Sequence, residues 1–484
     1  MLGVSGLRGI VGRSLTPEVA ARYAAAVGGW LVQRHTGRTR PQVAIACDGR
    51  AGAPAVVAAA TAGLLASGCD VVPLGVAMTP TVGAVVDTLG LAAGVQVSAS
   101  HNPQQWNGLK IVVREAGLRA GRPDACAPSA ATANQIIERF RGAVSYAEWD
   151  RVGELDSESS PAEAHTDAVM TALSAIAPAR KIRSQKFEVA LDSVGGAGGV
   201  WTADFLARQL GCNVRAYGPH TDGLFTHTPE PTRENLEAFS KAVRKRKAHV
   251  GFAQDPDADR LAVIDEKGRY IGEEYTLALA AEALLGGRAA GKPTRGRKPR
   301  PRATVLVANL STSRMIDDVA ARYGARVVRT AVGEANVVEA MKRERDAGAD
   351  VVLGGEGNGG VIWPAVTYIR DSIGAMALVL WLMSRTGKTV SELVATAPAY
   401  AIEKRKVDLA RKEHARPAVE KLAAAYGDAR IDLQDGIRID WDDRRAWLHV
   451  RASNTEPIMR LIAEAPDSGQ AAAILDDAAR IIGG

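Results

Sequence analysis

Short apolar runs alternate with longer amphipathic stretches along most of the chain. The amphipathic stretches Ala51–Ala66, Asn235–Ala248 and Ala335–Ala347 are helix-like, and each precedes an apolar run of strand length. Each run, or one close to it, opens into a polar or glycine-rich loop. A helix, a short apolar strand and a loop, found three times, predict three similar α/β domains with mixed, mostly parallel sheets covered by helices.

The last part of the chain follows a different pattern. Arg430–Ile437 and Ala446–Val450 are predicted strands, and Gln470–Ile482 is a predicted closing helix, which is typical of a smaller α+β domain. We therefore expect four domains, with boundaries near residues 152, 266 and 398. In residue ranges these are 1–152, 153–266, 267–398 and 399–484.

Composition agrees with a globular protein but identifies no activity. Apolar residues make up 46% of the 484 residues and charged residues 24%, which is ordinary. No uncharged apolar run is long enough to span a membrane, and Ile373–Met383 is predicted to be part of a buried helix. The first residues lack a signal peptide's apolar region. The cysteines show no metal-ligand spacing, so we expect a reducing, cytoplasmic location; they are Cys47, Cys69, Cys126 and Cys212.

The net charge of +6 and the isoelectric point near 9.1 have a local source. The segment 288–302 contains seven Lys or Arg residues, three prolines and no acidic residue. Such a segment is typical of a disordered surface insertion. The alternative is a salt-sensitive attachment to a polyanion. No aromatic residue interrupts the segment to stack on bases, so we do not expect nucleic acid as a partner.

Ser100 lies in the most informative loop of the chain. An apolar run beginning at Val95 ends in this loop, and Pro103 prevents a helix from continuing through it. We therefore expect the Ser100 hydroxyl to be displayed at the carboxyl end of a strand, where α/β sheets place functional residues. With His101 beside it and Lys110 nearby, Ser100 is a candidate nucleophile. The alternative is a polar loop that only caps a helix.

Three aspartates follow a second apolar run. Asp255, Asp257 and Asp259 stand two residues apart on a predicted loop, where their oxygens can converge on a hard cation such as Mg²⁺. An EF-hand would place a glycine where this chain has Arg260 and would have helical flanks, whereas Val250–Ala253 and the residues after the loop look like strands. A solvated acidic turn is the other alternative.

A glycine-rich loop follows the apolar run that begins at Val351. Its polar side chains are Glu356 and Asn358, and a carboxylate with a carboxamide suits the hydroxyl groups of a sugar. The glycines would let a ligand approach the backbone closely.

The loop 451–460 is a candidate phosphate cradle. Its side chains combine two guanidinium groups with hydroxyl and amide groups, which are the groups that bind phosphate. The residues are Arg451, Ser453, Asn454, Thr455 and Arg460. The alternative is the start of a helix capped by Ser453 or Thr455, with Pro457 in its first turn.

In this order, the four loops resemble those of the α-D-phosphohexomutase superfamily, which interconverts sugar 1-phosphates and 6-phosphates. Ser-Ala-Ser-His-Asn-Pro resembles its phosphoserine loop, Asp-Pro-Asp-Ala-Asp-Arg its metal loop, Gly-Glu-Gly-Asn-Gly-Gly its sugar loop, and Arg-Ala-Ser-Asn-Thr-Glu-Pro its phosphate loop. Lesser matches at Ser5–Gly12, Thr228–Pro231 and Asn309–Ser313 extend the resemblance from residue 4 to about residue 464.

The resemblance implies four domains around one central cleft and a covalent phosphate on Ser100. Mg²⁺, one per subunit, would be bound by the Ser100 phosphate and the three aspartates, because phosphate adds about −1.5 to −2 charge to a site that already holds three carboxylates. Arg8, Lys110 and Arg260 would orient the phosphoryl group. A sugar bisphosphate would be both intermediate and activator, and a hexose phosphate the substrate. The substrate would be bound by Thr330, Gly333, Glu356 and Asn358 together with the phosphate loop.

The resemblance also raises points that the sequence leaves open. Lys110 matches a lysine proposed as general acid or base, and neighbouring cations would lower its pKa; His101 would position the serine. The sugar loop of well-known relatives usually reads Gly-Glu-x-Ser-Gly-His, whereas this chain has Asn358 and Gly360, as in archaeal-type mutases acting on glucosamine, glucose or mannose phosphates. We expect Gly360 to leave room for a water molecule.

Two other activities, and the oligomeric state, are also left open by the sequence. One is a metal-dependent phosphatase or phosphotransferase in which water captures the phosphoserine. The arginine-rich loop 451–460 argues against this activity, because it would retain a bisphosphate. The other is a non-catalytic basic binding protein, for which only the segment 288–302 speaks. A monomer and a homodimer are both compatible with the sequence.

Overall fold

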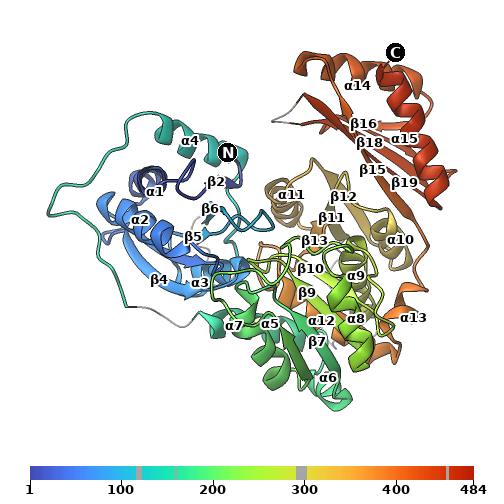
Figure 1. The fold of residues 1–484 in the computed structure, drawn as a ribbon, viewed down its shortest axis with the longest axis horizontal. Coiled ribbons are helices and arrows are strands. Elements are labelled where there is room, and N and C mark those ends of the chain that lie inside the picture. The colour runs from blue at the N-terminus through green and yellow to red at the C-terminus, as the bar shows by residue number, and fades with distance from the viewer. Residues whose placement is uncertain (116–122, 158–160, 290–301, 454–456, 484) are drawn as a thin grey trace.

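The computed structural model describes residues 1–115, 123–157, 161–289, 302–453 and 457–483. Four sheets follow one another along the chain, and their domains lie in an arc whose two ends are the first domain, in blue, and the last, in red (Figure 1). Three α/β domains with mixed sheets and a C-terminal domain confirm the predicted fold class, although the first sheet has more antiparallel pairs than parallel ones. The proposed boundaries near 152, 266 and 398 fall between successive sheets.

The first domain contains a six-stranded sheet in the order β1-β2-β6-β5-β3-β4. β3 pairs in parallel with β4 and β5, whereas the remaining pairs are antiparallel. Val43 and Ile45 of β3 pack toward α1 and α2, and Ala44 and Ala46 pack toward α3, so helices cover both faces. The elements are β1 (Leu2–Gly3), β2 (Gly6–Ile10), α1 (Pro17–Arg34), β3 (Gln42–Cys47), α2 (Ala53–Ala66), β4 (Asp70–Val76), α3 (Thr79–Leu89), β5 (Ala93–Val97), β6 (Trp106–Val113) and α4 (Ala130–Arg141).

The second and third domains each contain a four-stranded sheet with two parallel pairs and one antiparallel pair, in the orders β10-β9-β7-β8 and β12-β11-β13-β14. In the second domain the elements are α5 (Ala162–Ser174), α6 (Ala179–Gln185), β7 (Glu188–Asp192), α7 (Gly198–Asp204), the π-helical turn Phe205–Gln209, β8 (Asn213–Tyr217), α8 (Glu237–Arg246), β9 (Val250–Gln254) and β10 (Leu261–Ile264). In the third they are α9 (Glu273–Ala289), β11 (Thr304–Asn309), α10 (Met315–Arg322), β12 (Arg326–Thr330), α11 (Glu334–Asp346), β13 (Asp350–Glu356), β14 (Gly360–Ile362), α12 (Ser372–Thr386) and α13 (Val390–Val394).

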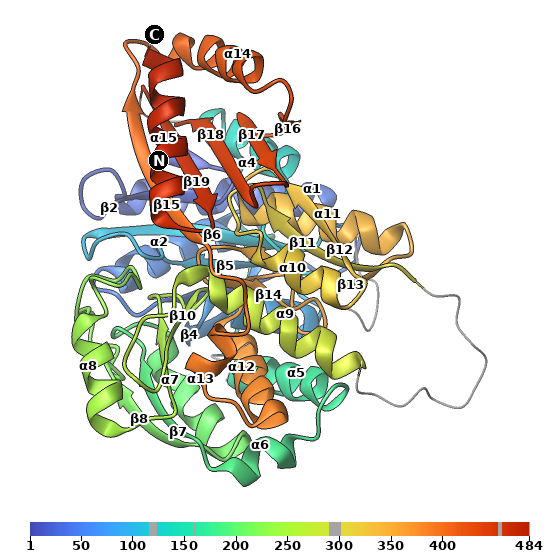
Figure 2. The same ribbon diagram turned by 90° about the vertical axis from the view of Figure 1, so that its right-hand side faces the viewer.

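The helix α12 joins the second and third domains. Every residue from Ser372 to Met383 is buried, which confirms the buried helix predicted at Ile373–Met383. α12 packs against α9 of its own domain and against α5 and α6 of the preceding one, so one hydrophobic cluster extends through both domains. Figure 2 shows α12 among these helices.

The fourth domain is an antiparallel sheet, in the order β15-β19-β18-β17-β16, that packs against two helices. The single strand predicted at Arg430–Ile437 is wrong, because β16 ends at Asp432 and the chain turns before β17. Gly436 in this turn has φ +70°, and a Cβ there would lie 2.1 Å from the carbonyl oxygen of Val450. The elements are β15 (Ala401–Asp408), the 3-10 turn Lys412–His414, α14 (Ala415–Ala425), β16 (Arg430–Asp432), β17 (Ile437–Trp441), β18 (Ala446–Ala452), β19 (Ile458–Ala465) and α15 (Ser468–Gly483).

The three α/β domains share one loop design. In each, a strand of the parallel part of the sheet ends in a candidate functional loop, and the chain returns as the adjacent antiparallel strand: β5 to β6, β9 to β10, and β13 to β14. The loops between them contain Ser100, the three aspartates and Asn358. The fold therefore places each candidate loop at a strand end that the same sheet anchors on both sides.

No helix among the described residues is long and apolar enough to cross a membrane. Residues 290–301 of the basic segment lie outside the described residues. Of its two described ends, Arg288 forms an ion pair with Asp350, and Arg302 is exposed.

Candidate active site

Ser100 is buried, not displayed as the sequence suggested. Its exposed fraction is 3%, and its φ is +50°, in the left-handed region that residues other than glycine seldom adopt. The hydroxyl Oγ donates to Oδ2 of Asp255 over 2.7 Å. The loop after β5 thus contacts the loop after β9, which belongs to the second domain.

A buried ion pair between Asp48 and Arg50, which the sequence analysis did not identify, supports the backbone of the Ser100 loop. The guanidinium of Arg50 donates to the carbonyl oxygens of Ser100 (2.5 Å) and Trp106 (2.6 Å), while its Nε donates to Asp48 Oδ2 over 2.8 Å. Ser98 donates to the same carboxylate oxygen over 2.7 Å. Asp48 and Arg50 follow the apolar strand β3, and this position at a strand end is the signal that could have revealed them.

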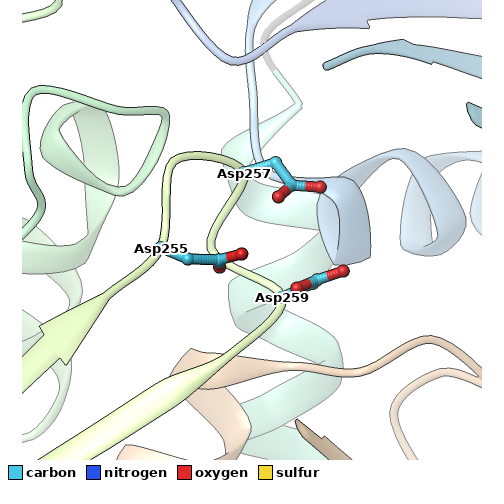
Figure 3. Close-up of side chains that lie close together, drawn as sticks. All are labelled: Asp255, Asp257 and Asp259. Carbon is cyan, nitrogen blue, oxygen red and sulfur yellow. The ribbon is translucent and has the colours of Figure 1, made fainter. Parts of the chain in front are cut away.

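Asp255, Asp257 and Asp259 form a compact acidic cluster. All three have an exposed fraction of 0%, and one oxygen of each lies within 4.8 Å of an oxygen of the others. They lie on the loop between β9 and β10 with their carboxylates turned to the same side (Figure 3). The strands on both sides exclude the EF-hand, and burial excludes a solvated acidic turn.

Cations from three domains surround this cluster. Lys110 Nζ forms an ion pair with Asp257 and lies 3.0 Å from Asp259 Oδ2, and Arg260 Nε lies 3.1 Å from Asp255 Oδ2. Arg370 Nη2 lies 2.7 Å from Asp259 Oδ2. The protein's own cations therefore already balance much of the negative charge of the three aspartates.

The pKa of Lys110 is shifted in the direction opposite to the one expected from the sequence. Burial lowers the pKa, but the attraction of Asp257 and Asp259 outweighs burial, so the pKa is raised above its usual value. Lys110 is therefore firmly cationic. Burial, Arg260 and Arg8 lower the pKa of His101 to about 3, so this imidazole is neutral.

The cluster fits a hard divalent cation. Oδ1 of Asp257 and Oδ1 of Asp259 are buried and accept no hydrogen bond from the described residues. Leaving such oxygens unpaired is costly, and a cation would satisfy them. Oxygen ligands from three carboxylates are the set that Mg²⁺ prefers. Two guanidinium nitrogens, Arg8 Nε and Arg260 Nη2, are buried without a partner among the described residues. Both would be satisfied by an anion such as phosphate.

Arg370 connects the acidic cluster to the sugar loop, and the sequence did not single it out. Besides Asp259, its guanidinium contacts Glu356 Oε2 at 2.7 Å and Glu334 Oε2 at 3.3 Å. A Cβ on Gly360 would lie 2.3 Å from Arg370 Cδ. The expectation that Gly360 leaves room for water is therefore wrong, because the side chain of Arg370 fills that space. Arg370 directly precedes Asp371, the N-cap of α12, and this position in the sequence is the signal that could have identified Arg370.

The sugar loop itself is held by short polar contacts. Glu356 Oε1 accepts from Asn309 Nδ2 over 2.9 Å and from the backbone N–H of Gly333 over 3.2 Å. Asn358 Oδ1 accepts from the N–H of Gly360 over 3.2 Å, and its amide nitrogen donates to none of the residues that the structure describes. Thr330 is buried, and its hydroxyl donates to the carbonyl of Ala331. Of the predicted sugar-binding residues, Glu356 and Asn358 reach the cavity described below.

The phosphate loop is a hairpin, so its interpretation as a helix start is wrong: β18 ends at Ala452 and β19 begins at Ile458. Arg451 and Arg460 are paired across these strands. The N–H of Ser453 donates to the carbonyl of Ile458 over 2.9 Å. Asn454 and Thr455 lie outside the described residues.

A cavity of about 390 Å³ lies between the third and fourth domains. One wall is acidic and polar and comes from the sugar loop, β11 and the start of α9, and the other is basic and comes from β15, β18 and β19. Its charged and amide residues are Glu273, Glu274, Asn309, Glu356, Asn358, Lys404, Arg405, Lys406, Arg451 and Arg460. Ser100 and the aspartates lie outside its lining, and Arg370 connects the two regions through Glu356.

The chain was compared with known protein families and proteins. Four models, described as phosphoglucomutase/phosphomannomutase domains, match it: α/β/α domain I at residues 1–127, domain II at 163–268, domain III at 273–400, and the C-terminal domain at 405–481. A phosphoglucomutase/phosphomannomutase of Thermococcus kodakarensis is 34% identical over 98% of this chain and 97% of its own length. A probable phosphoglucosamine mutase of Methanopyrus kandleri is 34% identical over 99% and 97%. The crystal structure of a putative phosphomannomutase of Thermus thermophilus superposes with a TM-score of 0.78 at 24% identity, covering 100% of this chain and 99% of that one.

Proposed function

This chain belongs to the phosphoglucomutase/phosphomannomutase family, whose members are isomerases, and from that premise we propose that it interconverts hexose 1-phosphates and 6-phosphates through a phosphorylated Ser100. One observation carries the proposal: the Ser100 hydroxyl lies 2.7 Å from an acidic cluster that has unsatisfied buried oxygens and is ringed by cations. A serine in such surroundings can carry a phosphoryl group whose charge is balanced on several sides.

In the proposed reaction, phosphate passes from Ser100 to a free hydroxyl of the bound sugar monophosphate. The bond between phosphorus and Ser100 Oγ breaks as the bond to the sugar oxygen forms, and the product is a sugar bisphosphate. After the bisphosphate has exchanged its two ends, its other phosphate returns to Ser100 and the isomeric monophosphate is released. Free bisphosphate would act as the activator, since it can phosphorylate Ser100 again.

The proton transfers have two candidate groups beside the Ser100 loop, His101 and Lys110. His101 Nδ1 is buried without a hydrogen-bond partner among the described residues, but with a pKa of about 3 its imidazole is a weak base. It would accept the proton of the sugar hydroxyl only once a phosphate dianion bound nearby has raised that pKa. Lys110 is cationic and returns a proton to Ser100 Oγ as that oxygen leaves phosphorus. Arg8 and Arg260 hold the oxygens of the phosphoryl group.

Asp255, Asp257 and Asp259, together with the phosphate on Ser100, would hold one Mg²⁺ per subunit. When bound, the ion supplies positive charge that offsets the charge of the transferring phosphoryl group. The aspartates need this help most when Ser100 is phosphorylated, because their own charge is already paired with Lys110, Arg260 and Arg370.

The substrate would bind in the cavity between the third and fourth domains. Arg451 and Arg460 bind the phosphate that is not reacting, and Glu356 and Asn358 contact the sugar hydroxyls. The names of the relatives support glucose, mannose or glucosamine phosphates as substrates. A cavity that retains the second phosphate also speaks against the alternative of a phosphatase, in which water would capture the phosphoryl group.

The test is to incubate the purified protein with Mg²⁺, a trace of sugar bisphosphate and glucose 1-phosphate, mannose 1-phosphate or glucosamine 1-phosphate. A mutase yields the corresponding 6-phosphate without release of inorganic phosphate. Stoichiometric inorganic phosphate would instead establish the phosphatase. Absence of both products with all three sugars would refute the proposed function.

A further inference from the structure

Glu274, near the start of α9, projects into the substrate cavity beside the sugar loop. Its Oε2 accepts from the backbone N–H of Ser313 over 2.9 Å. A Cβ on Gly357 would lie 2.0 Å from Glu274 Oε1 and 2.2 Å from Oε2. The carboxyl group of Glu274 therefore occupies the space that a side chain at position 357 would need, and it lies against the bare backbone of the sugar loop.

Glu274 differs from the other two glutamates of the cavity in its ionic partners. Glu356 is paired with Arg370 at 2.7 Å, and Glu273 is paired with Lys404 at 2.6 Å. Glu274 has no Lys, Arg or His nitrogen within 4.0 Å among the residues that the structure describes. The acidic wall of the cavity thus holds one carboxyl group that has no ion pair of its own among the described residues, although Lys404 attracts it from a longer distance.

The surroundings of Glu274 oppose its ionisation when the cavity holds no cation. Burial raises its pKa well above the usual value, the hydrogen bond from Ser313 and the charge of Lys404 lower it, and the neighbouring Glu273 and Glu464 raise it further. Glu274 is half-buried and accepts one backbone hydrogen bond, so a charge on it without an ion pair is costly, and a cationic group brought by a ligand would reduce that cost.

The two walls of the cavity carry opposite charge. The basic wall, with Lys406, Arg451 and Arg460, suits a phosphate group. Glu274 lies on the opposite wall, next to the loop expected to contact the sugar ring. A ligand that carries an anion at one end and a cation on its ring matches this distribution better than a neutral ring does.

We propose that Glu274 is a specificity-determining residue that favours hexose phosphates bearing an ammonium group, the amino-sugar phosphates, over neutral hexose phosphates. The inference rests on the proposed function, because it takes the cavity as the substrate site. An ammonium group supplies the missing positive charge and up to three hydrogen-bond donors, whereas a hydroxyl group supplies one donor and no charge. The proposal also requires glycine at position 357, because any larger residue would displace the carboxyl group of Glu274.

The main test measures kcat/KM for glucosamine 1-phosphate and glucose 1-phosphate in the wild type and in Glu274→Gln. Glutamine keeps the size and the acceptor oxygen but cannot carry the charge. We expect kcat/KM for glucosamine phosphate to fall on the order of tenfold or more, because a charge-assisted contact is lost. Glucose phosphate should change by less than about threefold, the range expected for surroundings that keep their shape.

Two further variants separate charge from shape. Glu273→Gln removes the adjacent carboxylate, which is paired with Lys404, and should reduce the preference between the two sugars less than Glu274→Gln does. Gly357→Ala keeps every charge but pushes the carboxyl group of Glu274 away, so it should reduce the preference in the same direction as Glu274→Gln. Equal losses for both sugars in Glu274→Gln and Gly357→Ala would overturn the inference, since Glu274 would then only shape the loop.

A binding measurement keeps the inference testable without turnover. Glucosamine 6-phosphate should raise the melting temperature of the wild type more than glucose 6-phosphate does, and Glu274→Gln should abolish the difference. If the wild type binds both sugars equally, the inference fails even if the mutase activity is present. If glucosamine 6-phosphate binds selectively but no sugar is isomerised, the proposed function fails, and only the ligand preference assigned to Glu274 is retained.

Discussion

Removing Arg370 should destabilise the protein more than removing any exposed arginine. The side chain of Arg370 is only 13% exposed and contacts Asp259, Glu356 and Glu334. In Arg370→Met, these carboxylates lose their common partner while the bulk of the side chain is largely kept. Removing one member of a buried ion pair costs about 3–5 kcal/mol, because the remaining charge stays buried without compensation.

This cost can be converted into a melting temperature. One kcal/mol shifts the midpoint by roughly 2–8 °C for domains of ordinary size. We therefore expect the calorimetric transition that includes the second and third domains to fall by on the order of 10 °C in a buffer with chelator. Saturating Mg²⁺ should reduce the difference in melting temperature between Arg370→Met and the wild type, because a cation beside Asp259 replaces part of the positive charge of Arg370.

The control is Arg208→Met. Arg208 also pairs with an aspartate, Asp204, at 2.6 Å, but the two side chains are 81% and 57% exposed. Exposed pairs contribute about 0–1 kcal/mol, so this variant should melt within about 3 °C of the wild type. If Arg370→Met also melts within that interval, the three contacts of Arg370 do not carry the stability that we assign to them.

Three further predictions concern the reactive centre and the second domain. Ser100→Ala should fold with a loss of about 1 kcal/mol for one hydrogen bond, yet lose nearly all mutase turnover and all covalent phosphate detectable by mass spectrometry; activity within tenfold of the wild type would exclude the phosphoserine. Chelation should abolish turnover and Mg²⁺ should restore it, with Asp257→Asn needing more Mg²⁺; full activity in excess chelator would contradict the metal assignment. Burial lowers the pKa of His227, but the hydrogen bond and charge of Asp192 outweigh burial and raise it, so its stabilising contribution is complete below about pH 6.5 and is lost as the pH rises through the raised value. The melting temperature should therefore fall more between about pH 6 and 9 in the wild type than in His227→Gln, and parallel curves would refute this.

The sequence predicted the parts of the fold that repeat a local pattern. The helices expected at Ala51–Ala66, Asn235–Ala248 and Ala335–Ala347 are α2, α8 and α11, with ends that differ by at most two residues. Such elements follow from hydrophobic periodicity alone. The strand expected at Arg430–Ile437 failed because its apolar residues belong to two strands, and the intervening turn depends on the left-handed backbone of Gly436.

The candidate site was predictable only where its residues stand together in the chain. Ser100 and the three aspartates were found as motifs, but their contact joins two domains, so the burial of Ser100 could not be anticipated. Arg370 pairs with Asp259, which is 111 positions away, and Arg50 pairs with the loop of Ser100 across 50 positions. No local pattern records such long-range partners, and the raised pKa of Lys110 depends on them as well.

The loop design shared by the three α/β domains bears on how such an enzyme can diversify. Each reactive loop leaves its sheet on one strand and returns on the neighbouring strand, and the two strands are paired at Val97 and Leu109, at Gln254 and Leu261, and at Glu356 and Gly360. Paired strands lie about 5 Å apart whatever the loop contains. Insertions or exchanges within a loop therefore need not disturb the strands that carry it. The substrate range can therefore change through a few substitutions in a loop. Because the paired strands anchor each loop independently of its sequence, the loops are also suitable units for grafting between members of the family.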